Sequence, residues 1–132
     1  MAHSIQVIEE SSFVLNDLDT IVLMCMMVRS VQSSPHRYSD LQEVVDHWKG
    51  ALEACAPGCI DLRLDMLTKD VAFRAFYDLM EEVRISAEEG SIDIDDLIRS
   101  SGVKGIDAAG YPLALVRKTI STINRYMSLK PS

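Results

Sequence analysis

Two cysteines and a histidine lie close together in the sequence and could act as metal ligands or as a redox pair. Cys55 and Cys59 bracket a Pro-Gly turn, and His47 precedes Cys55 by two turns of the same expected helix. Structural zinc needs about four nitrogen or sulfur ligands, usually with a Cys-x-x-Cys knuckle. Here the cysteine spacing is one residue longer, and a fourth ligand would have to be His36 or Asp61. We therefore favour thiols without a metal role and expect no metal or other cofactor. A small metal or redox enzyme around His47, Cys55 and Cys59 stays open as an alternative.

A second group of soft ligands, Met24-Cys25-Met26-Met27, could in principle bind copper(I). Consecutive residues of a helix point about 100° apart, so these side chains cannot converge on one ion. The group is more typical of a helix buried in a hydrophobic core.

The densest group of carboxylates lies between residues 81 and 96 and could recognise a basic partner. Its members are Glu81, Glu82, Glu88, Glu89, Asp93, Asp95 and Asp96. A di-iron bundle would need Glu-x-x-His motifs, which the sequence lacks. A calcium loop starting at Asp93 would have Leu97 and Ile98 where a ligand and a glycine are required. We interpret the seven carboxylates as a solvated face that binds a basic protein.

The charge distribution supports a basic protein partner over nucleic acid. The net charge is −7, and residues 1–110 carry all twenty acidic side chains with nine basic ones. Residues 111–132 carry four basic side chains and no acidic one. An acidic body repels phosphate, so the overall field opposes nucleic-acid binding.

A second function class rests on the segment from Leu97 to Val103 and the basic residues that follow it. The segment, LIRSSGV, is similar to the helix and Gly-Val turn of helix-turn-helix DNA-binding proteins. The resemblance implies a transcriptional regulator that uses a degenerate motif over about residues 97–125. Its phosphate contacts would come from Arg117, Lys118 and Arg125.

The elements that must position these residues read as helices. Helical spacing of apolar residues predicts helices over about 17–32, 40–56, 70–87 and 93–101, and a last one opened by Tyr111-Pro112. The first is apolar all round and belongs at the centre of a bundle. Ser39 and Gln42 have capping-box spacing at the start of the second, and Trp48 lies on its apolar stripe.

Two segments are ambiguous. Residues 1–12 could form an extended arm or a short strand over Ser4–Ile8. The alternating residues from Ile60 to Met66 suit a strand, but a strand without a partner has no place in a helical bundle, so we favour a helix.

The last helix carries a heptad seam that suits packing against another helix. Its members are Leu113, Val116, Ile120, Ile123 and Met127. A homodimer could form through this seam.

The chain is thus expected to form one all-α domain over residues 1–132, a bundle of five or six helices around the helix at 17–32. We expect a cytoplasmic protein, since residues 1–10 lack the basic start of a secretory signal and no apolar run is long enough to cross a bilayer. With three histidines and no Gly-x-Ser-x-Gly motif, a non-catalytic role is favoured. In size, acidity and lack of motifs the chain is similar to toxin-immunity proteins, antitoxins and type III secretion chaperones. That resemblance implies a protein that covers the surface of a partner.

Overall fold

The computed structural model describes residues 2–8, 11–90 and 92–127, and this part of the chain is mostly helical. Its elements are β1 (His3–Ile8), β2 (Ser11–Asn16), α1 (Asp17–Ser33), α2 (Gln42–Ala54), α3 (Asp70–Glu89), α4 (Ile94–Ser100) and α5 (Ala114–Met127), with 3-10 turns at Ser39–Leu41 and Leu64–Met66. Met1, Glu9 and Glu10 of the expected arm lie outside the described residues, as does the basic Lys130.

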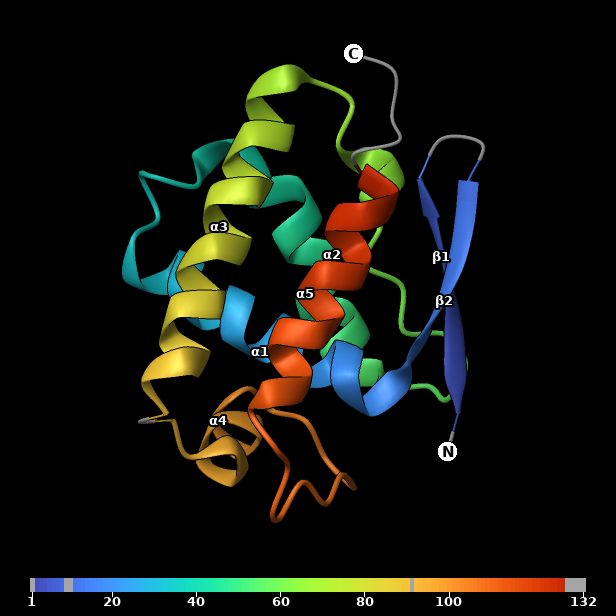
Figure 1. The fold of residues 1–132 in the computed structure, drawn as a ribbon, viewed down its shortest axis with the longest axis vertical. Coiled ribbons are helices and arrows are strands. Elements are labelled where there is room, and N and C mark those ends of the chain that lie inside the picture. Colours follow the sequence, from blue (N-terminus) through green and yellow to red (C-terminus); the bar gives the residue numbers. More distant parts are fainter. Residues whose placement is uncertain (1, 9–10, 91, 128–132) are drawn as a thin grey trace.

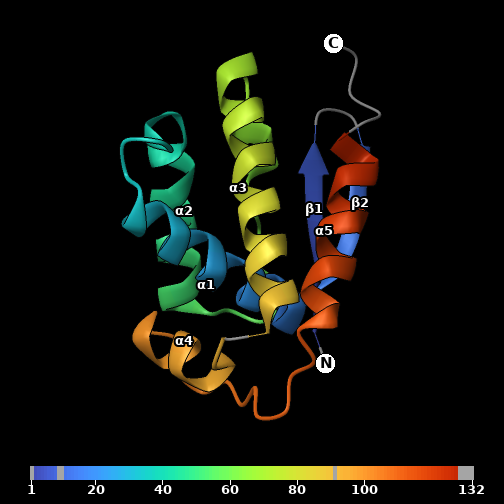
Figure 2. The ribbon, with the colours of Figure 1, turned by 60° about the vertical axis from the view of Figure 1, so that its left-hand side comes forward.

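Helix α1 is the centre of the fold, as its all-round apolar sequence predicts. Every residue from Thr20 to Val28 is buried, and α1 packs against α2, α3, α4, α5 and β2. Figure 2 shows α1 between α2 and α5, crossing behind α3. The side chain of Asn16 caps the start of α1 by accepting a hydrogen bond from the backbone N–H of Asp19 at 3.2 Å. Cys25 is part of the core, and burial raises the pKa of its thiol to about 11.

The all-α prediction omits an antiparallel hairpin formed by β1 and β2. The strands pair with His3 opposite Asn16 and Ile8 opposite Ser11. Figures 1 and 2 show the hairpin along one side of the molecule, next to α5. Phe13 of β2 is buried and stacks on the ring of Tyr126 of α5, with 4.3 Å between the ring centroids. The run of alternating residues in β2 is too short to mark a strand, and α5 supplies the packing that stabilises it.

The segment that leads from α2 to α3 is not the helix that we expected. Residues 59–63 have no regular secondary structure, and only Leu64–Met66 forms a 3-10 turn. The alternation is nevertheless real, because Ile60, Leu62 and Leu64 are buried while the residues between them are not. The indole N–H of Trp48, itself buried as predicted, donates to the carbonyl of Leu62 at 2.7 Å.

Side chains of β1 replace the backbone partner that this segment lacks. The amide of Gln6 donates to the carbonyl of Ile60 at 2.7 Å and accepts from the backbone N–H of Leu62 at 2.8 Å. The hydroxyl of Ser4 accepts from the backbone N–H of Ile60 at 2.9 Å. Strand β1 therefore buries the polar residues Ser4 and Gln6, while Ile5 on its other face is 63% exposed.

The helix ends agree with the predicted boundaries to within a few residues, with one local exception. Gly90 ends α3 in the left-handed conformation, and the carboxylate of Asp93 caps α4. The capping box predicted at Ser39 and Gln42 does not form, because Ser39 begins a separate 3-10 turn and α2 starts at Gln42. The amide of Gln42 instead donates to the carboxylate of Asp46 at 3.0 Å.

The heptad seam of α5 is used within the chain. Val116, Ile120, Ile123 and Met127 are all buried, and α5 packs on α1 and α3. Of the five seam residues, only Leu113 is partly exposed. A homodimer through the seam would have to open this core, so the seam offers no free surface to a second copy.

The paired hydrogen bonds of Gln6 generate the first prediction. We expect Gln6→Ala to lower the free energy of unfolding by about 2 to 4 kcal/mol, since two buried backbone groups lose their partner. Urea unfolding followed by the fluorescence of buried Trp48 measures the change. Gln32→Ala, at an exposed glutamine of α1, is the matched control and should change stability by less than about 0.5 kcal/mol. Equal stability of both variants would contradict this account of the segment.

Candidate functional site

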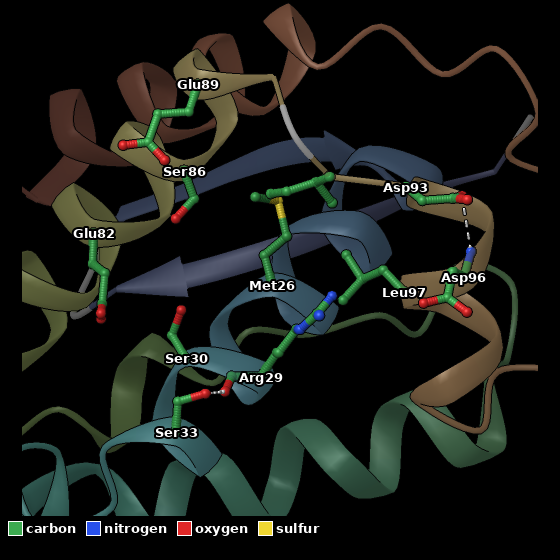
Figure 3. A pocket seen from close by; sticks show the side chains of 11 residues that line it. Met26, Arg29, Ser30, Ser33, Glu82, Ser86, Glu89, Asp93, Asp96 and Leu97 are labelled. Atoms are coloured by element: carbon green, nitrogen blue, oxygen red, sulfur yellow. Dashed lines mark hydrogen bonds between the residues drawn. The ribbon is translucent and has the colours of Figure 1, made fainter.

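A cleft of about 460 Å³ opens where the second half of α1 emerges from the core. Three helices form its walls, and Figure 3 shows the side chains that line it. From α1 come Met26, Arg29, Ser30 and Ser33, from α3 come Glu82, Ser86 and Glu89, and Ile92, Asp93, Asp96 and Leu97 come from the start of α4. Four carboxylates and one guanidinium thus share the lining, which makes the cleft acidic.

The cleft brings together four of the seven carboxylates that the sequence singles out. Glu82 and Glu89 lie seven residues apart and so share one face of α3, with Ser86 between them. Asp93, the N-cap of α4, and Asp96 in its first turn line the other side of the cleft, where the carboxylate of Asp93 points toward the backbone of Asp96 (Figure 3). Helix α3 ends at Gly90, and α4 lies across the end of α3 (Figure 1), so the two pairs line different walls of the cleft.

The other three predicted residues do not line this cleft. Glu81 and Glu88 are on a neighbouring face of α3, where both pair with Arg84; the Arg84–Glu88 distance is 2.7 Å. The hydrogen bonds from Arg84 lower the pKa of the Glu81 carboxyl. Asp95 is exposed on α4 and is not part of the lining. Of the seven predicted residues, four line the cleft, two belong to the paired face of α3, and Asp95 belongs to neither.

Two of the cleft carboxylates are held by hydrogen bonds. The hydroxyl of Tyr38, a fully buried residue, donates to Glu82. Burial and the hydrogen bond to Glu82 both raise the pKa of Tyr38. The carboxylate of Asp93 accepts from the backbone N–H of Asp96 at 3.1 Å, the dashed line in Figure 3. The walls are thus fixed at Glu82 and Asp93, while Glu89 and Asp96 are exposed side chains.

Sequence reasoning missed the contribution of α1 to this cleft. Arg29 extends across the cleft toward Leu97 (Figure 3), and no ion pair among the described residues includes it. Helix α1 continues past Arg29 to Ser33, so Arg29 lies about one turn before its end. The available signal was that Arg29 is the first charged residue after Asp19 in an otherwise apolar helix.

A smaller depression of about 250 Å³ adjoins the cleft and shares Glu82 and Ser86 with it. It continues along α3 past Asp78 toward Arg37. The carboxylate-lined surface is therefore longer than one pocket and follows α3 over several turns.

The structure separates Cys55 from the other two residues of the metal and redox alternative. His47 and Cys59 line one open depression of about 510 Å³ on α2, whereas Cys55 lines a different pocket at the start of α1. Within residues 2–8, 11–90 and 92–127, no three His, Cys, Asp or Glu side chains are grouped so that they could hold a metal ion. Burial and the nearby Asp17 raise the pKa of the Cys55 thiol, which disfavours the reactive thiolate.

The region proposed as a degenerate helix-turn-helix has a different geometry. Residues 101–113 separate α4 from α5, whereas the motif joins its helices by a turn of about three or four residues. Two basic residues of α5 already interact within the chain. Arg117 lies 3.7 Å from the carboxylate of Glu88, and Arg125 also has an interaction partner. The separation of α4 from α5 thus differs from that of the motif, while Arg117, Lys118 and Arg125 are exposed on α5.

The chain matches no model of a known protein family, no curated protein and no solved structure. The acidic lining of the cleft is therefore the main indication of function.

None of the helices among the described residues has both the length and the apolar character that crossing a membrane requires.

The hydrogen bond between Tyr38 and Glu82 generates the second prediction. Tyr38→Phe should lower the free energy of unfolding at neutral pH by about 1 to 2 kcal/mol, since the bond to a carboxylate is lost. The folded-state pKa of Tyr38 is raised above 10, so its contribution is complete below pH 10 and is lost as pH rises further. Urea unfolding in neutral buffer and above pH 10 should show the difference between wild type and variant shrinking.

Tyr77→Phe, on the exposed side of α3, is the control for this measurement. Tyr77 is 38% exposed, and burial alone raises its pKa. Its hydroxyl has no hydrogen-bond partner among the described residues, so the substitution should cost less than about 0.5 kcal/mol at neutral pH. A loss as large as that of Tyr38→Phe would show that the contact with Glu82 contributes nothing specific.

Proposed function

We propose that this protein is a small acidic binding module whose cleft between α1, α3 and α4 receives a basic segment of a partner protein. The observation that carries the proposal is the convergence of Glu82, Glu89, Asp93 and Asp96 from two helices onto one concave surface. Carboxylates on facing walls can bind one lysine or arginine side chain from both sides. A concave surface lined by one sign of charge also focuses the field and speeds association with an opposite charge.

The division of α3 into two faces supports a specific site over a general acidic surface. On one face, Glu81 and Glu88 are already paired with Arg84, so a partner would have to compete with an internal cation. On the cleft face, neither Glu89 nor Asp96 forms an ion pair with another described residue. A basic ligand therefore gains most at the cleft, where its charge meets carboxylates without cations of their own.

Arg29 has a definite role in this arrangement. Its guanidinium lowers the repulsion between the carboxylates around it, which favours the empty cleft. The same positive charge repels a basic ligand, so Arg29 limits the affinity of the cleft for that ligand. The exposed carboxylates of Glu89 and Asp96 would then select the partner. Backbone carbonyls of a bound partner segment would accept hydrogen bonds from the five N–H donors of the Arg29 guanidinium.

The third prediction tests whether the cleft, and not the net charge, recognises a basic ligand. Glu89→Gln combined with Asp96→Asn removes two cleft charges with little change in shape. Glu43→Gln combined with Glu53→Gln removes the same charge from exposed positions on α2. Binding of a fluorescent hexa-arginine peptide, measured by anisotropy at several salt concentrations, should weaken about fivefold or more for the cleft pair and less than about twofold for the control pair.

Arg29→Gln provides a change of opposite sign in the same assay. Because it removes the cation of the cleft, it should tighten binding of the peptide by about two- to threefold. Equal weakening by the cleft pair and the α2 pair would assign binding to the overall field and refute the site. Tight, salt-sensitive binding of the wild-type protein to duplex DNA would instead favour the regulator.

A further inference from the structure

The pocket lined by Cys55 lies at the opposite end of α1 from the acidic cleft. Its volume is about 290 Å³, and its walls come from the start of α1, the turn after α2 and the loop before α5. Apolar groups of Leu18, Ile21, Ile60 and Ile106 form most of the lining. A cavity of about 150 Å³ holds a benzene molecule, so this one has room for roughly ten non-hydrogen atoms.

The pocket wall is negative at two places. Asp17 and Asp107 are both in the lining, and no lysine or arginine among the described residues lines the pocket. Asp17 is only 6% exposed, and its two oxygens accept hydrogen bonds from Ser4 and from the backbone N–H of Gly58, the latter at 2.8 Å. A carboxylate oxygen has two lone pairs, so each oxygen of Asp17 keeps one acceptor position.

The pocket is built from fixed elements. The hydroxyl of Tyr111 donates to Asp19 at 2.6 Å and ties the loop before α5 to the start of α1. Within that loop the backbone N–H of Ala109 donates to the carboxylate of Asp107 at 3.0 Å. On the opposite wall, Asp17 fixes the turn at Gly58 through its buried carboxylate. These contacts preform the space, which lowers the cost of ordering it on binding.

We propose that this pocket binds a small organic cation, a primary amine with a short hydrocarbon body. The apolar walls would cover the hydrocarbon, and the ammonium group would donate to Asp17, with Asp107 adding a second negative charge. The same two carboxylates exclude carboxylate ligands of similar size, such as short fatty acids. The pocket is separate from the acidic cleft, so this proposal stands independently of the proposed function.

Cys55 supplies a direct readout because its thiol belongs to the pocket lining. A Cys59→Ser background removes the exposed thiol, while Cys25 is buried in the core. In this background, n-hexylamine should protect Cys55 from alkylation by N-ethylmaleimide in a saturable way. Hexanol and hexanoate should require about tenfold higher concentrations for the same protection. Absence of saturable protection by hexylamine, or equal protection by hexanoate, would overturn the proposal.

Two variants assign the binding to this pocket. Ile106→Trp fills the pocket and should abolish the effect of hexylamine, whereas Ile92→Trp, at a half-buried isoleucine of the acidic cleft, should leave it intact. Asp107→Asn keeps the shape of the loop and should weaken hexylamine at least threefold without changing hexanol. Circular dichroism confirms that each variant is folded. Unchanged hexylamine protection in both Ile106→Trp and Asp107→Asn would refute the assignment.

Discussion

The burial of α1 on every side is the constraint on which the rest of the structure depends. A helix that is apolar all round needs a neighbour on each face, and here α2, α3, α4, α5 and the hairpin supply them. Seventeen residues of helix span about 25 Å. Two of the pockets lie near the ends of this helix, one beside Asp17 and Leu18 and the other beside Arg29 and Ser33. Both pockets are thus formed by the ends of α1 together with the elements that pack around it.

The buried start of α1 couples elements that are distant in the sequence. Asp17 holds Ser4 of β1 with one carboxylate oxygen and the turn at Gly58 with the other. Gln6 extends the same contact along the strand by binding both sides of the segment that contains Ile60 and Leu62. A two-stranded hairpin alone is marginally stable in water, so these side-chain bonds and the stacking of Phe13 on α5 are what attach it. The hairpin in turn satisfies backbone groups that would otherwise be buried without partners.

The sequence predicts the helices well because each has a full apolar stripe, and it fails where a partner decides the structure. Helix α1, the cap at Asp93 and the end at Gly90 are local features, visible in residue type and spacing. The conformation of residues 59–63 depends on Gln6, more than fifty residues away, so periodicity alone could not distinguish it from a helix. Similarly, the acidic group was evident from composition, but only the fold shows that Glu82 and Glu89 face Asp93 and Asp96 across a cleft. The place of Arg29 in the cleft could not be predicted, because the other charged residues of the lining come from α3 and the start of α4.

The distribution of charge on α3 explains why the acidic excess concentrates at the cleft. Residues 81, 84 and 88 form one stripe of the helix, and there Arg84 binds both glutamates while Arg117 of α5 adds a cation 3.7 Å from Glu88. The basic last helix therefore neutralises the face of α3 that it approaches, which reduces the repulsion within a chain of net charge −7. Residues 82 and 89 form another stripe, turned toward α1 and α4, where Arg29 is the one cation of the lining. Helix α4 begins with Asp93, Asp95 and Asp96, whose negative charges stabilise its N-terminus. The wall of the cleft formed by the start of α4 is therefore acidic as well. Internal compensation on one side of α3 and its absence on the other thus produce a localised negative surface, which is the property that a site for a basic ligand requires.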